Sequence, residues 1–411
     1  MSEKDIMPFD FEKAAKKQII KVIGVGGGGG NAVKNMFREG IHDVAFALCN
    51  TDAQALAKSE IPIKVQLGRS GLGAGNNPPK ATEEAEESIE AIRSLFSDDT
   101  KMVFITAGMG GGTGTGASPV IAREAKAAGM LTVGVVTIPF RFEQKPKIMQ
   151  ALRGVDAIAA HVDALLVINN ERLFEVYPDM SVPTGFAKAN EILTVAIKSI
   201  AELITVEGTI NLDFRDVEKV LKNGGVAVMS YGFGKGEHRL TAAINEALHS
   251  PLLNDNDVYN SKKILFNIYH SKTHPLLMSE MEELTQFMDE FRNKDIEVIW
   301  GIADDDSLDE NVKITILATG FGISNIPGME SAFAGRASEA TAAPGAVPAP
   351  TTPTPAVDEA RINDIYGEAF RTFLFEDGDL DNDVLIAAVA NSPTFSRTPA
   401  ELKNLQGMRN L

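Results

Sequence analysis

The sequence predicts an α/β protein with a parallel sheet that carries helices on its faces. Short apolar runs alternate with helical segments from residue 19 to residue 169, and glycine-rich turns follow several of these runs. A second series of strands and helices spans residues 225–322 and predicts a second, smaller α/β domain. The chain has 411 residues, 44% of them hydrophobic, which is enough for two domains and some unpacked sequence.

The first element is a strand predicted over residues 18–25, which runs directly into the five glycines 26–30. A helix is expected over residues 31–38. The G-x-G-x-x-G spacing of dinucleotide-binding folds is matched by Gly24, Gly26 and Gly29. Asp52 follows the next predicted strand, where a ribose-binding acid would lie. Because one such fingerprint is weak evidence, a nicotinamide-dependent oxidoreductase remains an alternative at this point.

The most informative stretch is MVFITAGMGGGTGTGASP at residues 102–119, which predicts a buried strand, a turn and the first turn of a helix containing Thr115, Ala117 and Pro119. Its glycines are Gly108, Gly110, Gly111, Gly112, Gly114 and Gly116. Each glycine costs about 0.5–1 kcal/mol relative to alanine unless its freedom is needed, so a large group is expected to approach this backbone. Bare N–H groups at a helix N-terminus, with the hydroxyls of Thr113 and Thr115, predict a phosphate site.

A third loop, residues 67–79, contains Gly71, Gly73 and Gly75 and precedes a helix predicted over residues 81–96. This loop could equally be an ordinary connection. Further on we expect a helix to about residue 128, a strand over 131–137, a helix over 147–160 and a strand over 164–169. Since ligands of parallel sheets bind outside the carboxyl ends of the strands, the glycine loops should share one edge.

The segment 188–205 is helical and apolar on most faces, which predicts a buried helix between the two domains. The second domain is expected to contain strands over residues 226–233, 262–269, 296–302 and 312–320 and helices over 238–248 and 279–292. It has no glycine-rich anion loop, so we expect it to act as a scaffold or contact surface.

Residues 337–356 contain no leucine, isoleucine or aromatic residue and predict an extended, proline-stiffened linker. A helical face follows, formed by Ile362, Ile365, Tyr366, Ala369, Phe370, Phe373 and Leu374. A helix this short is only marginally stable alone in water. We therefore expect it either to pack against the rest of the chain or to bind a partner.

Composition argues against several classes. Cys49 is the single cysteine and the six histidines lack ligand spacing, so neither a disulfide nor a metal site is expected. The net charge of −17 argues against a nucleic-acid or anionic-membrane surface. No apolar run reaches the roughly 18 residues of a membrane span, and residues 1–17 lack the apolar core of a signal peptide. A cytoplasmic location is therefore expected.

Four stretches together resemble the FtsZ family of bacterial tubulin homologues: GVGGGGGNAV at 24–33, NTDAQAL at 50–56, AGMGGGTGTGASP at 107–119 and NLDFRD at 211–216. The resemblance covers about residues 19–322 in order. It implies a tubulin/FtsZ-like fold in which a Rossmann-like GTP-binding domain (19–187) is joined by a buried central helix (188–206) to a smaller domain with the catalytic loop (207–323). A mobile N-terminal tail (1–18), a disordered linker (324–356) and a partner-binding tail (357–411) would flank these domains.

The same resemblance implies a GTPase that binds GTP or GDP with Mg²⁺ and polymerises head to tail into the division ring at mid-cell. Its implied partners are other copies of itself, together with membrane-tethering and other division proteins that bind the tail. No nucleic acid and no direct membrane insertion are expected. A tubulin-like GTPase that regulates without forming the ring remains an alternative.

The resemblance also implies roles for individual residues. The phosphates would be held by Gly26, Gly27, Gly28, Gly29, Gly30, Asn31, Gly110, Gly111, Gly112, Thr113, Gly114, Thr115 and Gly116. The residues beside the terminal phosphate, responding to its loss, would be Gly73, Ala74, Gly75 and Asn76. Glu143 matches the ribose-binding acid, Phe186 the ring that covers guanine, Asn190 the amide that reads its edge and Asn170 a base-side asparagine.

Two of the implied contact positions depart from the family pattern. Lys147 stands where the family usually has arginine, so a planar two-pronged contact is replaced by a point charge. Glu191 stands where the family usually has aspartate. Guanine remains the expected base.

The resemblance implies a catalytic loop containing Asn211, Asp213 and Asp216. The predicted helix 188–205 starts at the nucleotide edge and carries the chain roughly 27 Å away at 1.5 Å per residue, so these aspartates cannot reach their own nucleotide. They would act on a neighbour's nucleotide through a repeating, heterologous contact. Asp213 also fits an N-cap of a helix over residues 214–221, with Asp216 favouring the helix dipole. A capping carboxylate is a poor proton acceptor, so the pair is expected to orient water rather than deprotonate it.

Overall fold

The computed structural model describes residues 18–41, 43–176, 179–206, 208–249, 258–289, 291, 296–321, 382–390 and 405. The chain divides into two compact units, Met1–Gly322 and Ile323–Leu411. The predicted N-terminal tail, the linker and the amphipathic face at residues 362–374 lie outside the described residues.

The first unit contains one sheet of eleven strands in the order β3-β2-β1-β4-β5-β6-β8-β11-β9-β10-β7. Its first half is parallel throughout and consists of β1 (Ile20–Val25), β2 (Val44–Asn50), β3 (Ile63–Gln66), β4 (Met102–Gly108), β5 (Leu131–Ile138) and β6 (Ala164–Asn169). The carboxyl ends of these strands therefore lie along one edge, as the sequence predicts.

The second half of the sheet contains β7 (Gly208–Ile210), β8 (Gly225–Gly234), β9 (Lys263–His270), β10 (Glu297–Asp304) and β11 (Val312–Phe321). Strand β11 runs antiparallel to both β8 and β9, β10 is parallel to β9, and β7 is antiparallel to β10. The two halves are joined where β6 pairs with β8, through Ala164 opposite Gly225 and Leu165 opposite Val226.

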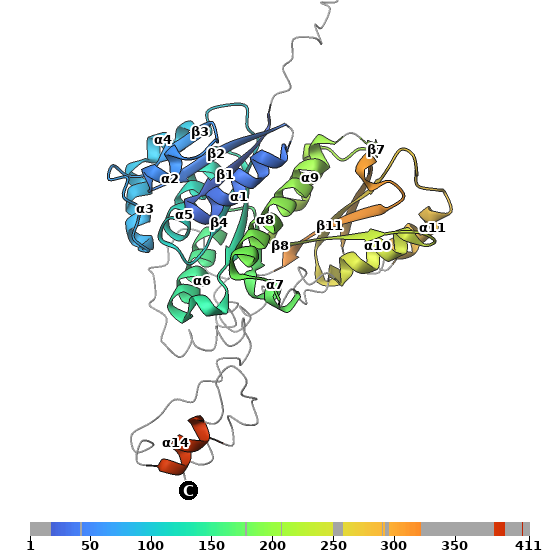
Figure 1. Cartoon of the computed structure of the whole chain (residues 1–411). Coiled ribbons are helices and arrows are strands. Elements are labelled where there is room, and N and C mark those ends of the chain that lie inside the picture. Colours follow the sequence, from blue (N-terminus) through green and yellow to red (C-terminus); the bar gives the residue numbers. More distant parts are fainter. Residues whose placement is uncertain are drawn as a thin grey trace, which may run out of the picture. The chain divides into compact units, whose positions relative to one another are not determined.

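Helices cover both faces of the first half (Figure 1). They are α1 (Gly26–Glu39), α2 (Ala53–Ala57), α3 (Pro78–Glu87), α4 (Ile89–Ser94), α5 (Gly112–Ala127), α6 (Lys145–Ala159), α7 (Asn170–Val176) and α8 (Val182–Thr205). Helices α1 and α8 pack on the face that presents Val22 and Phe104, and these residues share one buried core with Ile197 of α8. Helix α5 contacts both α3 and α6.

The second half carries α9 (Phe214–Leu221), α10 (Arg239–Leu248) and α11 (Glu280–Asp289). Short 3₁₀ turns are η2 (Arg141–Glu143), η3 (Val258–Asn260) and η4 (Asp306–Leu308). Helix α10 contacts β8 and β11, and α9 contacts the end of α8.

Helix α8 runs between the two halves of the sheet, as Figure 1 shows, and is buried along much of its length. It begins at Val182, six residues before the predicted start, so the predicted domain limit at residues 187 and 188 falls within it. The reason is local: the Ser181 hydroxyl accepts from the Thr184 N–H at 3.3 Å as an N-cap, and Pro183 lies in the first turn. These cues were missed because Pro183 and Gly185 are also typical of loops.

Three other predictions need correction. Helix α1 begins at Gly26 rather than Asn31, and α5 begins at Gly112, which leaves Pro119 inside the helix instead of in its first turn. The single helix predicted over residues 81–96 is two helices, α3 and α4. They separate at Ser88, whose hydroxyl accepts from the Gly68 N–H at 2.8 Å and donates to the Glu84 carbonyl at 2.9 Å. The short elements β3, β7, α2 and α7 were not predicted.

The second unit contains α14 (Asp383–Ala390), which the sequence patterns did not predict. Asn382 caps it by accepting from the Leu385 N–H at 3.0 Å, and Leu385 packs against Leu405. Among the described residues of both units, no helix has the length and apolar character needed to cross a membrane.

Candidate nucleotide site

The two glycine-rich turns pack against each other through bare backbone. A Cβ on Gly29 would lie 2.1 Å from the carbonyl oxygen of Thr106, and one on Gly114 would lie 2.5 Å from that of Gly108. Gly26, with φ +70°, lies close to the amide of Gly114. Several glycines of the motif are therefore required because β4, α1 and α5 meet without side chains between them.

Three other glycines have a different role, since among the described residues no heavy atom lies within 4 Å of the Cβ position of Gly27, Gly75 or Gly111. Gly27 is in the first turn of α1, and Gly111 immediately precedes α5. Gly27 and Gly111 therefore leave the N-termini of α1 and α5 uncovered. Backbone N–H groups at a helix start bind anions, so this is where a phosphate chain can approach.

The two threonines of the central motif are held in different ways. Thr113 Oγ1 lies 2.7 Å from Thr51 Oγ1, which follows β2. Thr115 is buried, and its hydroxyl accepts from the Gly110 N–H at 2.9 Å. Thr115 therefore fixes the conformation of the turn, in which Gly110 has φ +96°, whereas Thr113 is partly exposed at the start of α5.

The third loop is part of the same edge rather than an independent connection. The Gly73 N–H donates to the Thr51 carbonyl at 3.0 Å. A Cβ on Gly112 would lie 2.9 Å from the Asn77 nitrogen and 3.0 Å from the Ala74 Cβ, so the loop rests on the beginning of α5. Asn77 then caps α3.

Glu143 lies in η2 beside the central turn. Its Oε1 accepts from the Phe140 N–H at 3.0 Å, and its Oε2 lies 2.5 Å from Lys147 Nζ. The Lys147 carbonyl oxygen would in turn lie 2.9 Å from a Cβ on Gly110. The predicted ribose acid, its lysine partner and the phosphate turn are therefore contiguous.

A cluster of three phenylalanine side chains extends from η2 towards α8. Phe140 is buried, stacks on Phe142 at 5.0 Å between ring centroids, and meets Phe186 edge-on at 5.2 Å. Phe186, on the first turns of α8, is 39% exposed, so part of the side chain is available to a ligand. Phe142 and Phe186 also meet edge-on at 6.2 Å.

The amides predicted at the base lie on α7 and α8. Asn170 is 5% exposed, and its Oδ1 has no hydrogen-bond partner among the described residues. A buried acceptor of this kind is unfavourable unless a ligand or water satisfies it. Asn190 is partly exposed one turn after Phe186, while Glu191 is exposed and pairs with Lys188 at 2.7 Å.

The predicted catalytic residues lie beyond the other end of α8, which has 24 residues and hence a length of about 36 Å. Asp213 caps α9 by accepting from the N–H groups of Arg215 at 2.7 Å and Asp216 at 3.1 Å, and Asp216 accepts from the Asp213 N–H at 3.0 Å. Asn211 accepts from the Gly208 N–H at 2.5 Å. The structure thus separates these three residues from the glycine turns.

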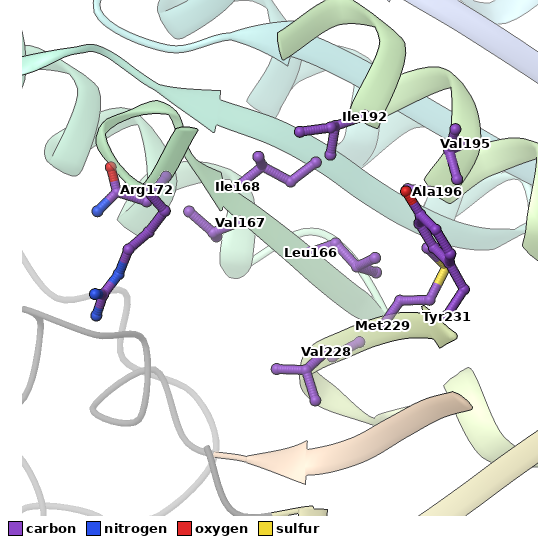
Figure 2. A pocket seen from close by; sticks show the side chains of 12 residues that line it. Leu166, Val167, Ile168, Arg172, Ile192, Val195, Ala196, Val228, Met229 and Tyr231 are labelled. Carbon is purple, nitrogen blue, oxygen red and sulfur yellow. The ribbon is translucent and has the colours of Figure 1, made fainter. Parts of the chain in front are cut away.

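A small cleft lies away from the glycine turns, where β6 and β8 diverge after their two paired positions (Figure 2). Its lining is mainly apolar and includes Leu166 and Ile168 of β6, Ile192 and Val195 of α8, and Met229 and Tyr231 of β8. It reaches Asn169 and Arg172 beside Asn170. Neither the glycine turns nor the aspartates of the catalytic loop line it.

Sequence reasoning missed three residues that organise this edge: Thr51, Phe140 and Gln150. Thr51 and Phe140 could have been suspected because each directly follows or nearly follows a strand at the glycine edge. Gln150 lies in the middle of α6, where no local pattern marks it. Asp52, the acid of the nicotinamide alternative, caps α2 by accepting from the N–H groups of Gln54 and Ala55.

Comparison with known proteins agrees with this geometry. Residues 19–178 match the GTPase domain of the Tubulin/FtsZ family, residues 225–322 the C-terminal domain of the FtsZ family and residues 368–410 the FtsZ C-terminal family. The chain is 46% identical over 424 residues to the cell division protein FtsZ of Porphyromonas gingivalis, covering 99% of this chain and 91% of that one. It is 44% identical to the FtsZ of Wigglesworthia glossinidia brevipalpis, covering 75% and 81%.

Among solved structures, the fold matches an FtsZ dimer from M. jannaschii with a TM-score of 0.67 and 39% identity, covering 73% of this chain and 88% of that one. The parallel half of the sheet, the long central helix and the second half are thus found together in a relative of known structure. The chain belongs to the FtsZ family of tubulin homologues.

Proposed function

We propose that this protein is a GTPase that assembles head to tail into filaments of the bacterial division ring. One observation carries the proposal. The uncovered N-termini of α1 and α5, the Phe186 ring and the Glu143 carboxylate lie along the same edge of the sheet. A phosphate chain, a ribose and a planar base each find a chemically suitable partner along this one edge.

The role of each residue in nucleotide binding follows from its position along this edge of the sheet. The N–H groups around Gly27 and Gly111 bind phosphate oxygens, together with the Thr113 hydroxyl. Glu143, oriented by Phe140 and Lys147, accepts hydrogen bonds from the ribose. The unsatisfied Asn170 oxygen accepts from the guanine edge, which offers N–H donors, and Asn190 contributes a second amide.

The hydrolytic site is completed by a second subunit. Asn211, Asp213 and Asp216 belong to the far end of α8, so they reach the phosphates of the next molecule rather than their own. The resulting contact joins two different surfaces and repeats along a filament. The capping box of Asp213 and Asp216 gives both carboxylates a fixed orientation, which suits them to align and polarise a water molecule.

Mg²⁺ would neutralise charge on the phosphates. Among the described residues no group of three His, Cys, Asp or Glu side chains could hold a metal ion. The ion would therefore be held mostly by phosphate oxygens and water, as is usual for Mg²⁺ with nucleotides. The Thr113 hydroxyl, in the first turn of α5, lies 2.7 Å from the Thr51 hydroxyl and is a neutral oxygen available to such an ion.

The test is the rate of GTP hydrolysis per subunit as a function of protein concentration, with Mg²⁺, for the wild type and Asp213→Ala. A site shared between subunits gives a rate that is near zero at low concentration and rises past a threshold. The variant should bind GTP and hydrolyse none. A rate independent of concentration, or normal turnover by the variant, would contradict the shared site.

The tail distinguishes a ring protein from a tubulin-like regulator. Residues 368–410 match the FtsZ C-terminal family, and we propose that the segment 357–411 recruits membrane-tethering and other division proteins at mid-cell. Removal of this segment should leave filaments and GTP turnover intact but abolish localisation to the division site. Retained localisation would favour another attachment.

A further inference from the structure

Gln150 contacts two loops of the proposed nucleotide site at once. It lies on α6, and its Nε2 donates to the Gly110 carbonyl oxygen at 2.9 Å and to Asn76 Oδ1 at 3.2 Å. Gly110 belongs to the central turn between β4 and α5. Asn76 belongs to the third loop, which leads into α3. One half-buried side chain therefore links the two loops.

Both acceptors are presented by backbone in the left-handed region, with φ +96° at Gly110 and +56° at Asn76. Glycine adopts this region without strain, and asparagine tolerates it better than most residues. Such a conformation at Asn76 nevertheless depends on contacts that hold it. The Gln150 amide supplies a contact to the Asn76 side chain from outside the loop.

The third loop is held by hydrogen bonds before and after its tip, which we call its two anchors, and is open to solvent at Gly75. Before it, the Gly73 N–H donates to the Thr51 carbonyl, and after it Asn77 caps α3. Gly75 lies between these anchors, and no described heavy atom lies within 4 Å of its Cβ position. The turn is therefore uncovered at Gly75 while Ala74 is packed against α5, and the Gln150 amide holds the Asn76 side chain between the two anchors.

Resting on the proposed function, we propose that Gln150 is a positioning residue that couples the third loop to the central phosphate turn and thereby sets the preference for GTP over GDP. The Gln150 amide holds the loop against the turn at Gly110, where the loop is placed to contact a terminal phosphate. With GDP the loop has no phosphate to contact, so the Gln150 link contributes little to affinity.

The experiment measures Kd for GDP and for the slowly hydrolysed analogue GTPγS with the full chain, below the concentration at which it assembles. Gln150→Met keeps the length of the side chain and removes both donors. Losing hydrogen bonds of this kind should reduce the ratio of GTPγS to GDP affinity by about 3- to 10-fold. Gln286→Met, at an exposed position on α11, is the matched control and should leave the ratio unchanged.

Asn76→Gly removes the other side of the contact without straining the backbone, because glycine accepts a φ of +56°. It should lower the same ratio, and combining it with Gln150→Met should add little, since both variants break one link. An unchanged ratio, an equal loss of affinity for both nucleotides, or fully additive effects would each overturn the proposal. A wild-type chain that binds neither nucleotide would instead refute the proposed function.

Discussion

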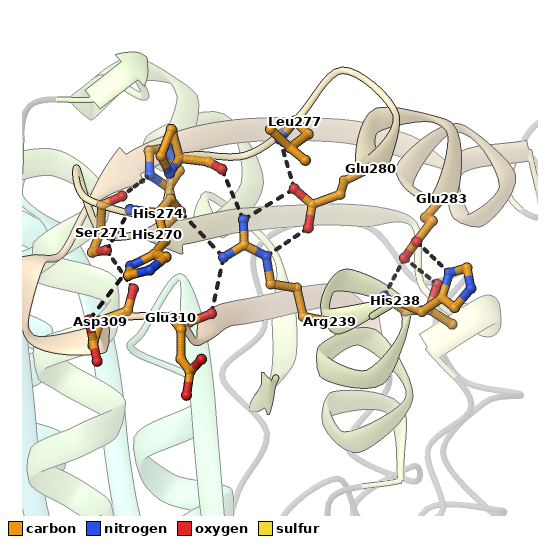
Figure 3. Close-up of polar contacts among 12 residues, drawn as sticks. His238, Arg239, His270, Ser271, His274, Leu277, Glu280, Glu283, Asp309 and Glu310 are labelled. Atoms are coloured by element: carbon orange, nitrogen blue, oxygen red, sulfur yellow. Dashed lines mark hydrogen bonds and ion pairs between the residues drawn. The ribbon is translucent and has the colours of Figure 1, made fainter. Parts of the chain in front are cut away.

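Arg239 holds Glu280 through two hydrogen bonds, from Nε at 2.7 Å and from Nη2 at 3.2 Å, and both side chains are largely buried. Figure 3 shows the guanidinium between this carboxylate and the backbone. It also donates to the carbonyl oxygens of His274, Pro275 and Glu310. One side chain at the start of α10 therefore ties down the segment that follows β9 and the turn that precedes β11.

We expect Arg239→Met to lower the free energy of unfolding by about 3 kcal/mol, because it leaves Glu280 and three carbonyls without their donor. Arg38→Met is the matched control, since Arg38 pairs with Glu60 at 2.9 Å where both side chains are more than 60% exposed. Its cost should be below about 1 kcal/mol. Urea unfolding of both variants measures the difference, and equal costs would show that the buried pair adds nothing.

The same pair predicts a pH dependence. Burial raises the pKa of Glu280, but the hydrogen bonds from Arg239 and the Leu277 N–H, with the Arg239 charge, lower the pKa by more, so it lies below its ordinary value. The carboxylate's contribution to stability is therefore complete above the unfolded-state pKa of about 4.3 and is lost as the pH falls through the folded-state pKa. As the pH falls below about 5, wild type should lose more stability than Arg239→Met. Parallel curves would contradict this.

Asp213 has a structural and a proposed chemical role, and two substitutions separate them. Asparagine caps helices as well as aspartate, whereas alanine costs about 1 kcal/mol. Asp213→Asn should thus retain the stability of α9, which Asp213→Ala loses. We expect Asp213→Ala to abolish GTP hydrolysis and Asp213→Asn to slow it about 100-fold or more, because the charge that orients water is gone. Normal turnover by Asp213→Asn would reduce Asp213 to an N-cap.

Alanine substitutions should have opposite effects on stability at a glycine in open space and at a glycine packed against backbone. Gly27→Ala places a methyl in open space within α1 and should stabilise the fold by about 0.5–1 kcal/mol while weakening GTP binding. Gly29→Ala places a methyl 2.1 Å from the Thr106 carbonyl oxygen and should destabilise by about 1–3 kcal/mol. Thermal unfolding with and without GTP measures both. Unaltered GTP affinity in Gly27→Ala would remove Gly27 from the phosphate site.

Phe186 should contribute to the affinity for GTP and GDP alike. Stacking of a base on an aromatic ring is worth about 1–3 kcal/mol. Phe186→Leu should therefore lower the affinity for GTP and for GDP by roughly 5- to 150-fold. Phe233→Leu is the matched control, since Phe233 is 44% exposed and meets Tyr231 edge-on much as Phe186 meets Phe140. Equal affinities in the two variants would show that Phe186 does not cover the base.

Much of the fold could be predicted from local patterns. The strand over residues 164–169 and the helix over 214–221 match β6 and α9 at both ends, because an apolar run or an N-cap marks each limit. The start of α8 was wrong because Ser181 and Pro183 determine it, not the apolar pattern that begins later. The helix predicted over residues 81–96 breaks because Ser88 binds Gly68, a contact that sequence spacing cannot reveal.

The sequence by itself determined the class of the protein, the three glycine loops at one sheet edge and the placement of Asp213 at a helix start far from them. These depend on hydrophobic period, glycine content and capping residues, which act within a few neighbours along the chain. Only the tertiary structure decided which glycines pack and which remain open, and that Gln150 joins Gly110 to Asn76. Those contacts join residues far apart in sequence, so they exist only once the sheet has brought its loops together.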